Sequence, residues 1–253
     1  MTQKKKSLGQ LLSDTFLLIK KNFADLAAVV AIVYVPFTLF LFFVLTLPLV
    51  FKDNLSTWSS GEKALSFLLF FILFAVFVTF AFLALLLFSI AMLKKVKACD
   101  EGQALLPLEA YKEARPLLGS FIVVNLWVLL KVVLWSLLLI IPGIVFALFY
   151  SFAQMTFVFE GKKSLSALRA SRDIIQPFFF EFFWKSLVAG ILFCVVSGSI
   201  NFIIERIFSL KTGYDPVIVA TLENFIGGFL GVFLVVFWYF FYKDLKGRSL
   251  RVA

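Results

Sequence analysis

Two ionisable residues lie inside long apolar segments of this chain, where a charged side chain needs a partner. Lys131 is 14 residues after Leu117 and 10 before Ile141. Glu223 lies about two helical turns into another apolar segment. An ionisable group at the centre of a bilayer costs about 2.5 to 3.5 kcal/mol on insertion scales, so it normally faces protein or water. Lys131 and Glu223 are therefore candidates for an intramembrane polar pair.

This pair has a functional and a structural interpretation. As a functional site, it would couple the movement of a proton or a small solute across the membrane. As a structural feature, it would hold two helices together, or Lys131 would extend its amine toward the membrane surface. Transporters often contain helices that are broken at matched positions. Here an interruption is expected only at Pro36, with Ser197-Gly198-Ser199 a weaker candidate. The structural interpretation is therefore favoured.

Four basic residues beside a short predicted helix are a second group of candidates. Lys162 and Lys163 lie shortly after an apolar segment that ends at Phe159, and a helix is expected to begin at Ser164. Arg169 and Arg172 flank the apolar face of that helix, where they can extend toward lipid phosphates. Each basic residue near an anionic membrane surface contributes about 1 kcal/mol to binding. We therefore predict that these four residues contact anionic lipid headgroups.

Other polar and small residues in the chain are expected to serve helix packing. Glu181 precedes Lys185 by four residues, which is the order that stabilises a helix. Gly227-x-x-x-Gly231, with Gly228 beside it, permits close helix approach in the sixth span, and packing within the bundle is favoured over dimerisation. The side-chain amides that can bond between helices are Asn125, Gln154, Asn201 and Asn224.

Six apolar segments carry these residues, and each approaches or exceeds the roughly 20 residues needed to cross a bilayer. They are 24–51, 64–93, 117–141, 143–159, about 184–210, and 216–242. The chain is 62% apolar and only 15% charged, whereas soluble domains are about half apolar and a quarter charged. We predict an all-α fold: residues 1–253 form one integral membrane domain, a polytopic bundle of six transmembrane helices.

The distribution of Lys and Arg predicts the orientation of the bundle. One side of the predicted membrane has 18 of these residues outside the spans and the other side has 4. Because cytoplasmic loops carry the excess of positive charge, both tails, 1–23 and 243–253, are expected to be cytoplasmic. The net charge of +9 is therefore expected to face anionic lipid rather than nucleic acid.

Short amphipathic helices are predicted on the cytoplasmic side, each before two spans. The first begins at Ser7, which can form a capping box with Gln10, and is expected to lie flat on the membrane. Packing on protein is disfavoured there, because no other soluble element is expected to be long enough. A second such helix lies between Pro107 and Pro116, and the third begins at Ser164.

The stretch from Ile140 to Gln176 carries a family pattern. It contains Pro142-Gly143, expected to be a tight turn that reverses the chain, and then an apolar helix that ends at Phe159. Glu160-Gly161-Lys162-Lys163 and Ser-x-x-Ala-Leu-x-x-Ser follow. With the start of the chain, this pattern resembles a bacterial family of six-span inner-membrane proteins, some named after the membrane domain of glycerophosphoryl diester phosphodiesterases. The resemblance implies a fold and an inner-membrane location, since most members have no established activity.

We expect no enzyme activity, no cofactor and no metal site. A lipid phosphodiesterase of the named kind would need a separate catalytic barrel of about 250 residues and, by resemblance, histidines, but the chain has no His. No metal-ligand cluster, nucleophile elbow or phosphate loop occurs. The expected function is a structural, lipid-interacting or partner-subunit module of the cell envelope. The alternative is a small-solute or ion transporter or channel that uses Lys131 and Glu223.

Overall fold

The computed structural model is all-helical, without strands, over the residues it describes, which are 5–51, 60–209 and 216–251. Within these residues, six helices are long and apolar enough to cross a membrane. The predicted all-α bundle is therefore confirmed, and the protein is a multi-pass membrane protein.

The helices are α1 (Leu8–Lys21), α2 (Phe23–Phe51), α3 (Ser60–Glu101), α4 (Pro107–Ala114), α5 (Leu118–Leu138), α6 (Ile140–Phe149), α7 (Ala153–Glu160), α8 (Leu165–Ile175), α9 (Phe179–Ser209) and α10 (Pro216–Ser249). Two short 3-10 turns, η1 (Arg115–Leu117) and η2 (Gln176–Phe178), lead into α5 and α9. Both contain a proline, Pro116 and Pro177, in their first turn.

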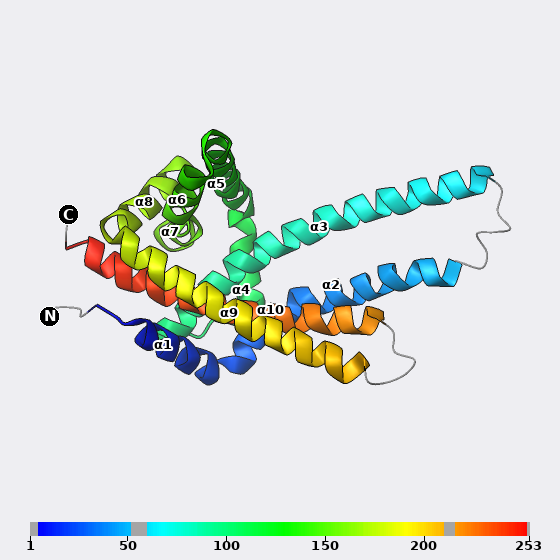
Figure 1. The fold of residues 1–253 in the computed structure, drawn as a ribbon, viewed down its shortest axis with the longest axis horizontal. Coiled ribbons are helices and arrows are strands. Elements are labelled where there is room, and N and C mark those ends of the chain that lie inside the picture. The colour runs from blue at the N-terminus through cyan, green and yellow to red at the C-terminus, as the bar shows by residue number, and fades with distance from the viewer. Residues whose placement is uncertain (1–4, 52–59, 210–215, 252–253) are drawn as a thin grey trace.

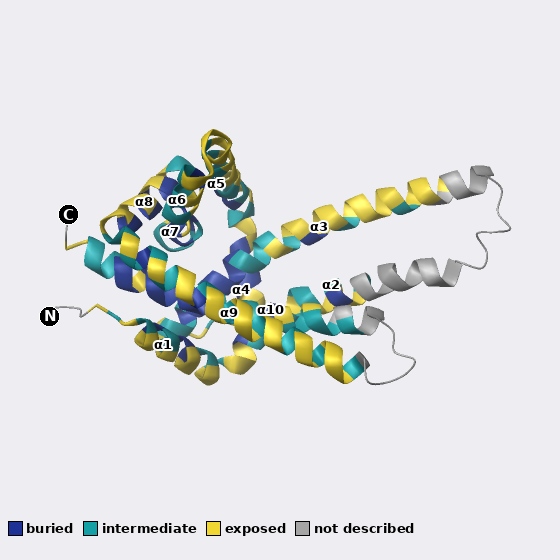
Figure 2. Cartoon of the chain, viewed as in Figure 1, coloured by how far each residue is buried: buried dark blue, intermediate teal, exposed yellow. Residues whose placement is uncertain are grey.

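The molecule has a packed end and a set of projecting helices (Figure 1). In this view α1, α7 and α8 gather on the left around the C-terminal part of α10, while α2 and α3 project to the right. Figure 2 shows that the buried residues concentrate at the packed end, where Phe152, Phe182 and Phe241 are almost fully buried. Along the projecting part of α3, by contrast, Phe80 is 70% exposed. Such apolar surface is suited to contact with hydrocarbon.

The chain reverses between α5 and α6 at Leu139, so the prediction of a tight turn at Pro142-Gly143 is wrong. Leu139 has extended backbone angles, whereas Pro142 and Gly143 lie inside α6. Proline is tolerated there because the amides of the first helical turn need no intrahelical partner. Gly143 instead permits close packing, since a Cβ at this position would lie 2.8 Å from Ser136 Cα on α5.

The fourth span is interrupted, although a continuous helix was predicted from Gly143 to Phe159. α6 ends at Phe149 and α7 begins at Ala153. Across this gap the Ser171 hydroxyl of α8 donates to the Phe149 carbonyl at 2.7 Å and accepts from the Phe152 amide at 3.0 Å. α2 and α9, in contrast, continue through Pro36 and through 197–199. The break therefore falls where a neighbouring hydroxyl satisfies the freed backbone groups, and not where the sequence suggested it.

The first helix packs on the protein. The predicted capping box is confirmed, since the Gln10 amide donates to Ser7 Oγ at 3.2 Å and the Ser7 amide to Gln10 Oε1 at 2.8 Å. α1 packs on α10 and α2 and buries Leu11 and Leu18. This packing was disfavoured in the sequence prediction, which ended the last span at Tyr242. α10 in fact continues to Ser249 and extends beyond that span, so α1 has a surface to pack on.

Candidate functional site

The predicted intramembrane pair lies on two helices with mostly different neighbours. Lys131 is on α5, which packs on α3, α6, α7 and α8. Glu223 is near the start of α10, which packs on α1, α2, α3, α8 and α9. Both residues are half-buried. In the part of the chain that the structure describes, no ion pair joins them, so their pairing stays a prediction.

The four predicted lipid contacts lie together on and just before α8. The opposite face of this helix is buried, including Leu168, Ser171 and Ile175, so its position on the bundle is set by packing. Of the four basic residues, Lys162 lies 3.3 Å from Glu160 Oε2, and Arg172 Nε donates to Gln176 at 3.3 Å. Lys163 and Arg169 are exposed, and neither has an ion pair with another described residue.

The close approach expected at Gly227 and Gly231 occurs at the residue between them. A Cβ at Gly227 or at Gly231 would meet nothing within 4 Å, whereas a Cβ at Gly228 would lie 2.7 Å from the Tyr34 ring of α2. Gly227 and Gly231 are four residues apart and share one face of α10, whereas Gly228 lies against Tyr34 of α2. Of the three glycines for which close approach was predicted, Gly228 is therefore the one that makes it.

One predicted amide contact between helices is confirmed. Gln154 Nε2 on α7 donates to Asn125 Oδ1 on α5 at 2.7 Å, and Asn125 Nδ2 donates to the Phe121 carbonyl at 2.8 Å. This bond joins the third span to the interrupted fourth span. Beside the interruption is a cavity of about 340 Å³, whose lining includes Ser89, Ser151, Gln154 and Trp238.

The structure also assembles a polar cluster along α10 that was not predicted. It consists of three carboxylates from α3, α7 and α9 and of the α10 side chains that contact them, and we call it the α10 cluster. Its members are Asp100, Glu160, Glu181, Tyr239, Tyr242, Lys243, Lys246 and Arg248. The three carboxylate side chains are only 15%, 15% and 13% exposed, so most of their surface is removed from water.

Two carboxylates of the α10 cluster are each held by a tyrosine and a lysine. Asp100 accepts from the Tyr239 hydroxyl at 2.7 Å and from Lys243 Nζ at 2.6 Å. Glu160 lies 2.9 Å from Lys246 Nζ and accepts from the hydroxyl of Tyr242 at 2.5 Å. In each case the tyrosine precedes the lysine by four residues.

This repeat has a simple helical origin. Residues 239, 242, 243 and 246 are spaced so that they lie on one face of a helix. The two acceptors, Asp100 and Glu160, lie in the last turns of α3 and α7, and these turns reach that face. The spacing is visible in the sequence, but the prediction places Lys243 and Lys246 in the cytoplasmic tail, 243–253, and not on a helix.

The third carboxylate connects the start of α9 to both ends of the chain. Arg248 donates to both Glu181 oxygens, at 2.9 and 3.0 Å. Lys185 Nζ lies 2.6 Å from Glu181, which confirms the predicted pair four residues apart. Lys5 Nζ is 3.2 Å away, and Lys185 also donates to the Lys6 carbonyl at 2.6 Å.

A further buried charge lies between α2, α3 and the loop before α4. Lys95 is 2% exposed, and its Nζ lies 2.5 Å from Asp25 Oδ2 and 2.6 Å from the Leu105 carbonyl. The amine is therefore compensated by a charge and a backbone acceptor, as a buried cation requires. Lys95 binds Asp25, and the cations of the α10 cluster bind the carboxylates of that cluster. Both sets of contacts therefore serve to join helices.

Comparisons with family models, with curated proteins and with solved structures found no match for this chain.

Proposed function

We propose that this protein is a non-enzymatic module of the bacterial cytoplasmic membrane that binds anionic lipids through the exposed surface of α8. The observation that supports this function best is a contrast between two sets of cations. Those of the α10 cluster are matched by carboxylates of the same chain. Lys163 and Arg169 have no such partner among the described residues, so they are available to an external anion.

The packing of α8 supports the same proposal. Because its apolar face is buried in the bundle, the flanking cations are held in place without the membrane. Arg172 also lies over the Phe149 ring, with 5.7 Å between the guanidinium carbon and the ring centroid. A prearranged set of cations loses less conformational entropy on binding than a flexible one.

The lipid-binding proposal is tested by removing two of these charges. Arg169→Gln combined with Arg172→Gln should lower the retention of phosphatidylglycerol by roughly thirty-fold, since each basic residue contributes about 1 kcal/mol near an anionic surface. Bound lipid would be measured by mass spectrometry of the purified protein. The matched control, Lys94→Gln with Lys97→Gln, also removes two charges, but these pair with Glu113 and Glu101. Equal retention by wild type and the arginine variant would refute the proposal.

We also propose that the chain belongs to the six-span inner-membrane family that the stretch from Pro142 to Ser171 resembles. A structural role in the envelope, or a role as a partner subunit, agrees with a chain in which charged residues hold helices together. No nucleic acid is expected to bind, because the unmatched cations of α8 lie beside apolar spans.

A transport function is the second candidate, and the interrupted fourth span favours it. Non-helical backbone within a membrane segment often lines a substrate site, and here a cavity of about 340 Å³ adjoins it. Lys131 and Glu223 would then serve the pathway. A double variant, Lys131→Met with Glu223→Leu, that folds normally but loses the cellular phenotype of the wild type would favour transport over the structural role.

A further inference from the structure

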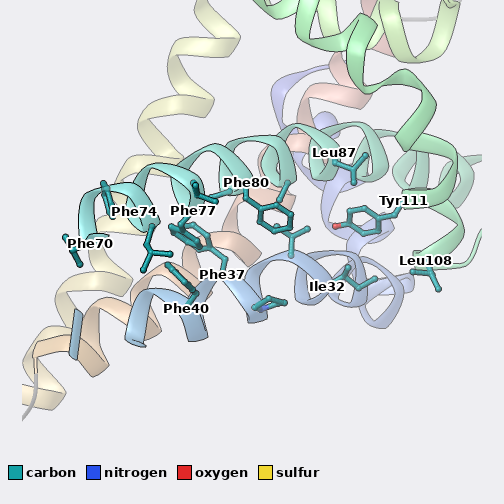
Figure 3. A pocket seen from close by; sticks show the side chains of 16 residues that line it. Ile32, Phe37, Phe40, Phe70, Phe74, Phe77, Phe80, Leu87, Leu108 and Tyr111 are labelled. Atoms are coloured by element: carbon teal, nitrogen blue, oxygen red, sulfur yellow. The ribbon is translucent and has the colours of Figure 1, made fainter. Parts of the chain in front are cut away.

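An apolar crevice of about 810 Å³ lies between α2 and α3 (Figure 3). Its walls carry the ring of Phe37 from α2 and the rings of Phe77 and Phe80 from α3. Tyr111, at one end, is the only residue of the described lining with a polar side-chain atom. Its hydroxyl donates to the Val29 carbonyl at 2.7 Å. The crevice is therefore lined almost entirely by hydrocarbon, which suits an apolar occupant.

The crevice is long enough for a whole acyl chain. Its lining includes Phe70 and Leu87 of α3, which are 17 residues apart and hence about 25 Å apart along the helix. One leaflet of bilayer hydrocarbon is about 15 Å thick, half of the roughly 30 Å core. The lining residues of α2 and of α3 belong to candidate membrane spans. Lipid is therefore the occupant that the surroundings would supply.

The end of the crevice at α4 carries positive charge. Leu108 and Tyr111 line the crevice, and Lys112 and Arg115 follow at a spacing that places all four residues on one face of the helix formed by α4 and η1. Lys112 and Arg115 are exposed. Neither forms an ion pair with any residue in the described ranges.

In the described ranges, neither carboxylate of α4 forms an ion pair with these two cations. Glu109 Oε2 accepts from the Leu106 amide at 3.0 Å, and Glu113 Oε2 lies 2.9 Å from Lys94 Nζ on α3. The two basic side chains are therefore left for an external anion beside the mouth of an apolar crevice. An amphiphile with a negatively charged head matches both features.

We propose that this crevice binds one anionic phospholipid, with an acyl chain between α2 and α3 and the phosphate on Lys112 and Arg115. The inference rests on the proposed function in one respect: α4 must lie at an anionic membrane surface. It is a separate site from the surface of α8, since it uses other helices and adds a specific place for the acyl chain.

The test uses the full-length protein in nanodiscs and a phosphatidylglycerol probe with a photoreactive diazirine on its acyl chain. Crosslinks mapped by mass spectrometry should fall on residues 32–40 and 73–84. Unlabelled phosphatidylglycerol should compete at lower concentration than phosphatidylcholine with the same chains. In Lys112→Gln with Arg115→Gln, roughly thirty-fold more phosphatidylglycerol should be needed, for about 1 kcal/mol per cation. Ala84→Phe, which fills the crevice and keeps both cations, should abolish the crosslinks.

The remaining arms separate this site from other sources of the signal. Arg169→Gln with Arg172→Gln should leave these crosslinks unchanged, so failure of the α8 proposal and failure of this one give different results. Inorganic phosphate at millimolar concentration should not compete; competition equal to that of the lipid would show a free-phosphate site and overturn the proposal. The proposal would also be overturned if crosslinks fell equally on exposed α9 residues such as Ile191 and Val195. The same holds if neither Lys112→Gln with Arg115→Gln nor Ala84→Phe changed the crosslinks.

Discussion

Glu181 is the residue through which three distant parts of the chain are joined. Its carboxylate binds Arg248 of α10, Lys185 of its own helix and Lys5 of the N-terminal segment. Arg248 binds it in a bidentate manner, which is the strongest geometry for a carboxylate and a cation. Because Glu181 is only 13% exposed, water cannot easily replace these contacts.

Glu181→Gln should therefore destabilise the protein. The amide keeps the size of the side chain but removes the charge, so Arg248 and Lys185 lose their shared anion. Hydrogen bonds to charged groups contribute about 1.5 to 3 kcal/mol each, and a loss in this range is expected as a lower melting temperature in detergent. Glu205→Gln is the matched control, since Glu205 is an exposed residue of the same helix. Equal melting temperatures for the two variants would show that the cluster does not stabilise the fold.

Sequence reasoning found the Glu181–Lys185 pair but not the two other partners of Glu181. Residues four apart on a helix are neighbours whatever the rest of the chain does, so that contact was predictable. Arg248 is 67 residues away along the chain, and its position depends on how α9 and α10 pack. No local pattern carries that information. The same limit applies to Lys95 and Asp25, which are 70 residues apart.

At the scale of the helix, hydropathy predicted where membrane segments lie but not where helices end. The last apolar segment stops at Tyr242, while α10 continues to Ser249. These additional turns bury Leu245, and their Lys243, Lys246 and Arg248 form ion pairs of the α10 cluster. A helix can therefore extend beyond its span when charged residues on other helices bind it, and hydropathy does not detect that kind of stabilisation.

The α5–α6 hairpin offers a test of close helix packing. Gly143→Ala should destabilise the protein by about 1 to 3 kcal/mol, the usual cost of overpacking, because the new Cβ would lie 2.8 Å from Ser136 Cα. The clash is with a backbone atom of Ser136, which cannot move aside as the end of a flexible side chain could. Gly119→Ala, on α5, is the control: its Cβ would meet nothing within 4 Å, and alanine is the better helix former. Thermal unfolding in detergent would compare them, and a stable Gly143→Ala variant would show that the close approach is not required.

The architecture of the whole molecule was predictable because a bilayer permits few solutions. Backbone groups in hydrocarbon must bond within their own segment, so long apolar runs become helices. Which helices become neighbours was not predictable in this way. In the described chain, α10 packs on α1, α2, α3, α8 and α9, and this central position follows from side-chain contacts rather than from hydropathy.

The remaining prediction concerns which end of the molecule faces the cytoplasm. α1, α8 and the C-terminal part of α10 lie at one end, and the C-terminal end of α2 and the N-terminal end of α3 project at the other (Figure 1). Most of the 18 basic residues counted for one side belong to the former end, so by the positive-inside rule that end should be cytoplasmic. A reporter active only in the cytoplasm should work when fused after Ala253 or inserted near Gly161, and should fail near Ser59, which lies outside the described residues. Reporter activity near Ser59, with none at the other two positions, would show the opposite orientation. The surface of α8 would then not face the cytoplasmic leaflet, whose anionic lipids the proposed function requires.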